Sequence, residues 1–285
     1  MAELTVGIDI GTTSVKAVAA DGAGRIVART QVPHPVRAPD PDTFEHDAAA
    51  IWVDGVLRAW DDVGEGRDIA GVTVSAMVPS LCGVDDRGHP VTPGLLYGDA
   101  RGRTGDDAGL QGEALGFARW LAAQPGVAAL WPAQAVANHA LCGEGALDTG
   151  TAMTLAPLFY GTVWDPALLG ELDLGADGFP RTVPGATPVG HRGPGAVAGG
   201  TIVALAEQVV GDARVPGDVL VICGTTLIPW ALTTELLEVD GLWSIHYSVP
   251  GIIAVGGASN AGGVFIDRVR SLAGDTDPEA VLGVD

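Results

Sequence analysis

The stretch that decides the fold is Val6-Gly7-Ile8-Asp9-Ile10-Gly11-Thr12-Thr13-Ser14-Val15-Lys16-Ala17-Val18. Apolar residues on both sides of a Gly-Thr-Thr turn predict two strands joined as a hairpin. Gly11 permits a tight turn, in which the backbone N–H groups of Gly11, Thr12 and Thr13 would converge on an anion. Asp9 is suited to holding Mg²⁺ through water, and Lys16, the only lysine in the chain, adds a positive charge. The stretch predicts a nucleotide phosphate site, although a purely structural hairpin has a similar composition.

Composition limits the classes of function. The chain has 285 residues with a formal net charge of −20, so we expect neither a nucleic-acid partner nor an anionic membrane surface. With 47% hydrophobic residues it should fold into one large domain or two modest ones. Cys82, Cys142 and Cys223 are widely spaced, which favours reduced thiols. No signal peptide and no membrane span is evident, so a cytoplasmic location is expected.

The spacing Asp-x-Gly-Thr-Thr-x-x-Lys resembles the first phosphate motif of the actin-like ATPase superfamily, in its FGGY carbohydrate kinase branch. A turn at 21–24 and a third strand at 25–32 would complete the antiparallel meander with which that fold begins. The resemblance implies an α/β, ribonuclease H-like domain with a mixed five-stranded sheet and helices on both faces. It also implies ATP and Mg²⁺ as cofactors and a sugar or polyol as substrate, a pentulose such as xylulose first.

A second Gly-Thr-Thr run, Gly224-Thr225-Thr226, lies between two apolar segments that read as strands. Its backbone N–H groups and hydroxyls would hold phosphate as the first turn does. In the family that the chain resembles, this is the second phosphate clamp.

Two segments are candidates for sugar contact. Met77 lies in a loop after the apolar segment 69–75, and a core-capping loop is an equal alternative. The segment with Tyr97, Asp99 and Arg101 resembles the family's Trp-x-Asp-x-Arg, with Tyr in place of Trp. An aromatic face stacks on a sugar's C–H surface, and the two charged groups bond to hydroxyls. A surface ion pair is the alternative.

A helical pattern follows the segment Phe44-Glu45-His46-Asp47. Its predicted apolar face at 3.6-residue spacing consists of Ala49, Trp52, Val53, Val56, Leu57 and Trp60. Sugar kinases of the family carry a similar Glu-Gln-Asp before a Trp. For His46 we expect no more than a capping position on a surface helix.

The segment Ala198-Gly199-Gly200-Thr201-Ile202-Val203-Ala204 departs from the family at one place. FGGY kinases carry Ala-Gly-Thr-Ile-Asp-Ala here, and their Asp is the general base that takes the proton of the attacking hydroxyl. The corresponding residue is Val203, which accepts no proton, so a contribution of about 10²–10⁴ in rate should be missing. Glu207, one turn further along, would lie roughly 6 Å away along the helix axis.

The expected organisation is an actin-like N-terminal domain over residues 1–255 and the start of a linker or second lobe over 256–285. Family members continue into a second lobe that binds adenosine, which this sequence does not include. Two functions stay open: a sugar kinase, and a catalytically inactive sugar- or partner-binding lobe derived from one. A separate C-terminal lobe or a homodimer is a further possible partner.

Overall fold

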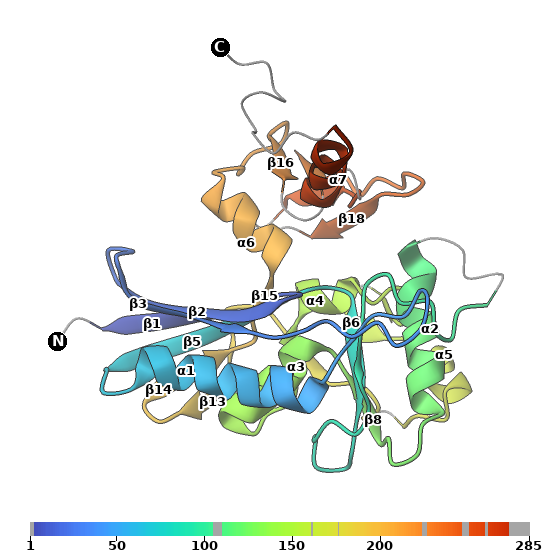
Figure 1. Cartoon of the computed structure of the whole chain (residues 1–285), viewed down its shortest axis with the longest axis horizontal. Helices are drawn as coiled ribbons and strands as arrows, with labels where there is room; N and C mark the ends of the chain where they lie inside the picture. Colours follow the sequence, from blue (N-terminus) through green and yellow to red (C-terminus); the bar gives the residue numbers. More distant parts are fainter. Residues whose placement is uncertain are drawn as a thin grey trace. The chain divides into compact units, whose positions relative to one another are not determined.

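The computed structural model describes residues 3–104, 110–160, 162–175, 177–223, 227–246, 251–259 and 262–273. The chain divides into two compact units, Met1–Val203 and Ala204–Asp285 (Figure 1). The expected end of the N-terminal domain at residue 255 stays a prediction.

The first unit contains, in chain order, β1 (Leu4–Ile10), β2 (Ser14–Asp21), β3 (Ile26–Pro33), β4 (Glu45–His46), η1 (Ala49–Gly55), α1 (Val56–Gly64), β5 (Ile69–Ala76), β6 (Ser80–Val84), β7 (Gly94–Leu96), α2 (Leu110–Ala122), β8 (Ala129–Trp131), α3 (Ala133–Cys142), β9 (Ala146–Asp148), α4 (Thr149–Met153), β10 (Phe159–Tyr160), β11 (Val163–Trp164), α5 (Pro166–Glu171), β12 (Arg181–Val183), β13 (Pro188–Arg192), β14 (Gly195–Ala198) and β15 (Thr201–Ile202). The second begins within α6 (Val203–Val210) and continues with β16 (Val219–Cys223), β17 (Leu227–Thr233), β18 (Trp243–His246), β19 (Ile253–Gly256) and α7 (Gly263–Ala273).

The main sheet of the first unit is mixed, as expected, and has seven strands in the order β13-β14-β5-β1-β2-β3, with β15 also paired to β5. The predicted meander is present as β1, β2 and β3, all antiparallel. Strands β14 and β15 pair in parallel with successive parts of β5, separated by Gly199 and Gly200. The expected count of five is therefore exceeded by two, because one strand position is interrupted at these glycines and β13 adds a hairpin to β14.

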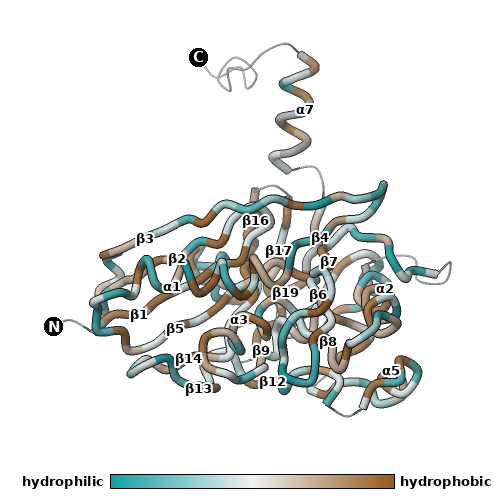
Figure 2. Tube along the Cα trace, turned by 60° about the horizontal axis from the view of Figure 1, so that its bottom comes forward, coloured by the Kyte–Doolittle hydropathy of each residue, from teal (hydrophilic) through white to brown (hydrophobic). Residues whose placement is uncertain are grey.

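One face of this sheet forms the main hydrophobic core. Alternate residues of the strands point toward α1 and α3, which lie on the same side of the sheet in Figure 1. They include Val6, Ile8, Ile10, Val15, Ala17, Val72 and Val74, each at most 3% exposed. Apolar residues recur along β1 and β5 in Figure 2. The opposite face receives the residues between them, which is where Asp9 and Lys16 lie.

The first helix differs from its predicted pattern. Residues Ala49–Gly55 form a π-helix, which then continues as the α-helix α1. The wider turn changes which residues face the core: Ile51 and Trp52 are buried, whereas Ala49 is exposed. The predicted 3.6-residue face is correct at Trp52 and Val56, which are buried, and at Val53, Leu57 and Trp60, which pack partly buried against the core. It is wrong at Ala49 and omits Ile51, because a constant period does not describe a segment with a π turn.

Smaller sheets complete the unit. Strands β4, β7, β6 and β8 form a four-stranded sheet, and helix α2 packs beside β6. In the second unit, β16-β17-β19-β18 form an antiparallel sheet with Trp230 stacked on Trp243. No helix in the described ranges is long and apolar enough to cross a membrane.

Candidate functional site

The carboxyl ends of three parallel strands meet at one edge of the main sheet. Ile10 of β1 lies opposite Ala76 of β5, which lies opposite Ile202 of β15. The turn beginning at Gly11, the loop beginning at Met77 and position 203 therefore all start at this edge. Ligands of open α/β sheets bind outside the carboxyl ends of parallel strands. The structure thus brings three predicted site segments to one place.

One register position before this edge, a polar row crosses the sheet. Lys16 pairs with Asp9, Asp9 with Ser75, and Ser75 with Thr201. Register partners point to the same face, and the residues before and after each of them on β1 and β5 are buried in the core. The row therefore lies on the face opposite α1 and α3. We name Lys16, Asp9, Ser75 and Thr201 the polar row.

Asp9 is the charged centre of the polar row. Burial raises the pKa of its carboxyl above the ordinary 3.8, and the nearby Lys16 ammonium offsets part of that rise. Its Oδ1 atom is buried and has no hydrogen-bond partner. A buried acceptor without a partner costs about 1–3 kcal/mol, so the site favours a ligand that supplies positive charge or hydrogen-bond donors.

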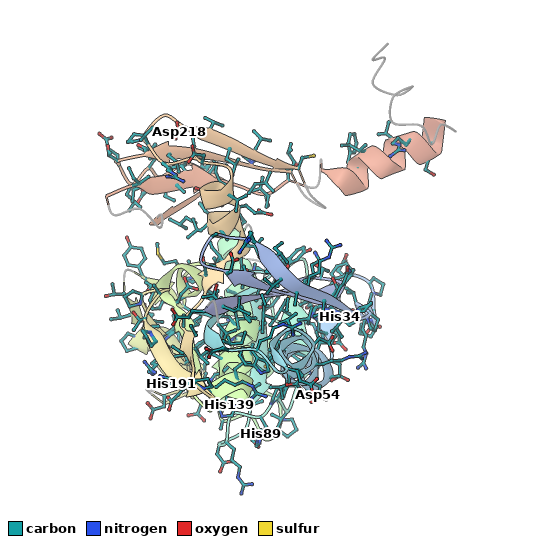
Figure 3. The ribbon with its side chains drawn as sticks, turned by 90° about the vertical axis from the view of Figure 1, so that its left-hand side faces the viewer. His34, Asp54, His89, His139, His191 and Asp218 are labelled. Atoms are coloured by element: carbon teal, nitrogen blue, oxygen red, sulfur yellow. The ribbon has the colours of Figure 1, made fainter. Side chains whose placement is uncertain are left out.

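This feature fits the divalent cation that the fold family uses. Mg²⁺ is often held by one or two carboxylates together with waters and phosphate oxygens. Asp9 with its free oxygen matches that requirement. Within the described ranges, no group of three or more His, Cys, Asp or Glu side chains is arranged to hold a metal by itself. In Figure 3, His34 lies apart from His89 and His139.

The turn after Asp9 is tight and held from two sides. The Gly11 N–H donates to the Ser14 carbonyl over 3.0 Å, so it is used within the turn and the expectation that it binds phosphate is not met. Thr12 Oγ1 shares a hydrogen bond of 2.9 Å with the Tyr97 hydroxyl, and the Thr12 carbonyl accepts one of 2.9 Å from His46 Nε2. The phosphate-site candidate and the sugar-site candidate are therefore directly connected through Thr12.

His46 contacts the turn that contains Thr12, a position that its sequence pattern did not reveal. It is fully buried, so the expected surface position is wrong. The Trp52 indole N–H donates to His46 Nδ1 over 3.1 Å, which leaves the single proton of the neutral ring on Nε2 for the Thr12 carbonyl. Burial lowers the pKa of His46 to about 4, so the ring is neutral at pH 7. The nearby Trp52 is the sequence signal for this contact, but the π turn that aligns Trp52 with His46 is not predictable from the sequence.

Asp99 and Arg101 form a buried ion cluster with Glu45. Arg101 Nη2 lies 2.6 Å from Asp99 Oδ2, and Arg101 Nη1 lies 2.8 Å from Glu45 Oε2. Asp99 is fully buried and also accepts the backbone N–H groups of Phe44 and Arg101. The Arg101 guanidinium stacks over Trp120 at 4.7 Å. The alternative of a surface ion pair is wrong.

This cluster leaves little free bonding capacity on Asp99, because both of its oxygens accept N–H groups of Arg101 and Phe44. The loop that carries Tyr97 is thereby fixed to strand β4, which carries Glu45 and His46. Sugar contact by Asp99 and Arg101 stays a prediction. In this structure their contacts hold the Tyr97 loop in place.

The remaining predicted residues differ in accessibility. The Met77 side chain belongs to the main core cluster and is 9% exposed, while its N–H donates to the Ile10 carbonyl. Val203 is half-buried at the start of α6. Gly224, Thr225 and Thr226 lie outside the described residues. The strands before and after them are antiparallel, with Cys223 opposite Leu227.

The buried side-chain amide of Gln134 holds the chain segment that precedes Val203. Gln134 Nε2 donates to the carbonyls of Val74 and Thr201, joining β5 and β15 just before their ends. Gly200 has φ +118°, and a Cβ there would lie 2.4 Å from Gln134 Nε2. Only glycine fits this close approach. Position 203 is therefore held at the site edge by Gln134, another residue that its sequence context did not reveal.

Comparisons with known proteins show which sequences and folds this chain is similar to. Residues 4–106 match the model of the FGGY family of carbohydrate kinases, N-terminal domain. A xylulose kinase of Streptomyces coelicolor is 39% identical over 100 residues, which are 34% of this chain and 20% of that protein. An apulose kinase of Pectobacterium atrosepticum is 35% identical over 169 residues, 55% of this chain and 32% of that protein.

Among solved structures, the xylulose kinase of Rhodospirillum rubrum superposes with a TM-score of 0.83 at 22% identity, covering 99% of this chain and 66% of that one. The chain thus spans a fifth to a third of the relatives matched by sequence, and about two thirds of this structural neighbour. We therefore identify residues 4–106 as an FGGY carbohydrate kinase N-terminal domain, in a chain that has the actin-like ATPase fold of the sugar kinases.

Proposed function

We propose that this chain forms the sugar-facing lobe of an ATP-dependent kinase that phosphorylates a hydroxyl of a small sugar or polyol, a pentulose such as xylulose first. The observation that carries the proposal is Asp9. It has a buried, unpartnered oxygen beside a Gly-Thr-Thr turn, at the carboxyl ends of parallel strands, inside the region that matches the FGGY model.

In this proposal the turn and the polar row act on the phosphates. The N–H groups of Thr12 and Thr13 and the Lys16 ammonium bind phosphate oxygens, and Asp9 holds Mg²⁺ through water. The cation, when bound, neutralises charge on the transferring phosphoryl group. Gly224, Thr225 and Thr226 form the second phosphate clamp. Such a site works by positioning and charge neutralisation, and the protein itself does little covalent chemistry.

The sugar side of the proposal rests on Tyr97. Its ring is the aromatic face for the sugar, and its hydroxyl is bonded to Thr12, so sugar and phosphate contacts are held at a fixed separation. Asp99 and Arg101 hold the loop that carries Tyr97 in place, and Met77 lines part of the sugar site. Several matched relatives are named for xylulose and one for apulose, although others are named for gluconate or glycerol; the former support a pentulose as the first substrate to test.

Val203 supports a second candidate function. A valine at the edge of the site has no group to accept the proton of the attacking hydroxyl. The chain would then bind sugar and phosphate without efficient transfer, as an inactive sugar-binding lobe. The two candidates differ in what an acid at position 203 would do.

The deciding experiment compares the wild-type chain with Val203→Asp. Calorimetry measures binding of xylulose, apulose, gluconate and glycerol, and a coupled assay measures ADP formation with each. If the chain is a kinase limited by the missing base, Val203→Asp raises turnover by about 10²–10⁴. If the chain is a binding lobe, both proteins bind a sugar and neither forms ADP. Absence of sugar binding in both proteins contradicts both candidates.

A further inference from the structure

The polar row contains a second buried oxygen with no partner. Ser75 Oγ, on β5, has no hydrogen-bond partner, and neither has Asp9 Oδ1 on the adjacent strand. The two residues are register partners and point to the same face. They do not bond to each other. Two unsatisfied buried oxygens side by side are uncommon, because each costs about 1–3 kcal/mol.

A shared ligand explains both atoms. A carboxylate oxygen only accepts hydrogen bonds, so the ligand must present donors or positive charge to Asp9, and an anion is disfavoured there. A single substrate hydroxyl has one proton to donate and would satisfy only one of the two oxygens. A hydrated divalent cation presents several water O–H donors outward, and oxygen-rich sites are those that Mg²⁺ occupies.

We propose that Ser75 is a further residue of the cation site, and that its hydroxyl bonds to water carried by the divalent cation that Asp9 holds. The inference rests on the proposed function and extends it by one residue. Ser75 acts on the hydration shell of the ion, and Asp9 supplies the charge. Thr73, two residues earlier on the same face of β5, pairs with Gly7 and has no carboxylate opposite it.

The test measures binding of Mn²⁺, as a stand-in for Mg²⁺, to the full chain at pH 7 by the loss of the free-ion EPR signal. Because the net charge of −20 binds some Mn²⁺ over the surface, Asp9→Asn supplies the baseline. Ser75→Ala and the control Thr73→Val each remove one hydroxyl. We expect Ser75→Ala to weaken the Asp9-dependent binding about 3- to 10-fold, as loss of one hydrogen bond does, and Thr73→Val to leave it unchanged.

A second readout distinguishes a ligand contact from a structural bond. In EDTA, Ser75→Ala should be at least as stable to heat as wild type, because it removes an unsatisfied hydroxyl. Unchanged Mn²⁺ binding, or a clear loss of stability in EDTA, overturns the role of Ser75 while leaving Asp9 in place. Absence of any Asp9-dependent Mn²⁺ binding overturns the inference together with the cation part of the proposed function, whereas sugar binding is still measured separately.

Discussion

Asp9 and Asp99 are both carboxylates withdrawn from solvent in the first unit, but their surroundings are opposite. Asp99 is fully buried with both oxygens hydrogen-bonded, to two backbone N–H groups and the Arg101 guanidinium. Asp9 has one buried oxygen with no partner, and burial raises its pKa. A satisfied carboxylate stabilises the fold, whereas an unsatisfied one costs stability and is available to a ligand. The two residues should therefore respond oppositely to the same substitution.

The largest effect is expected for Asp99→Asn. It removes one of the two carboxylates that compensate the buried Arg101, the other being Glu45, and breaking a buried pair from one side costs up to about 3–5 kcal/mol. Urea unfolding followed by tryptophan fluorescence measures the change. Asp47→Asn is the matched control, because Asp47 pairs with Arg37 at 3.1 Å on the exposed surface and should lose at most about 1 kcal/mol. Equal stabilities for the two variants would refute the distinction.

A smaller effect is expected for His46→Gln, and it depends on pH. The pKa of His46 falls from 6.5 in the unfolded chain to about 4 in the fold, because the ring is buried. The unfolded state therefore takes up the proton first as pH falls, and about 2 kcal/mol of stability is lost between pH 7 and pH 5. Glutamine keeps a donor for the Thr12 carbonyl and does not titrate, so this loss should disappear.

Thermal unfolding of both proteins at pH 7 and pH 5 tests this expectation. The pKa of His34, which is packed edge-on against His46 with ring centroids 4.6 Å apart, is also lowered by burial. It contributes to acid sensitivity in both proteins, so the comparison isolates His46. The same loss of stability in wild type and variant would show that His46 does not hold the turn as a neutral ring.

The smallest effect, and the one of opposite sign, is expected for Asp9→Asn. Because the pKa of Asp9 is raised in the fold, its contribution to stability is present below pH 3.8 and is lost as pH rises through the folded-state pKa. Asparagine does not ionise, so the variant should gain about 1 kcal/mol at pH 7 in EDTA and nothing at pH 3. Destabilisation at pH 7 would mean that the Asp9 carboxylate is already satisfied.

Much of the fold is predictable because it follows from residue patterns within short segments of the chain. The meander of β1 to β3 follows from alternating apolar residues and the Gly-Thr-Thr turn, and the Ile69–Ala76 strand from its apolar run. In η1 the predicted apolar face is wrong at Ala49 and omits the buried Ile51, because a π turn has no simple sequence period. One extra strand arises because Gly199 and Gly200 interrupt the strand position beside β5, where Gln134 bonds to the Thr201 carbonyl, and the other is β13, which pairs with β14.

The sequence by itself determined the position of the Gly-Thr-Thr turn after Asp9 and the valine at position 203, since both depend on residue type and spacing. Only the tertiary structure decided what each polar group does. It joined Thr12 to His46 and Tyr97, saturated Asp99 with Arg101, and left Asp9 beside Ser75 with two unpaired oxygens. The physical reason is that hydrogen-bond satisfaction is a property of neighbours in space, and these neighbours are up to 85 residues apart in the chain.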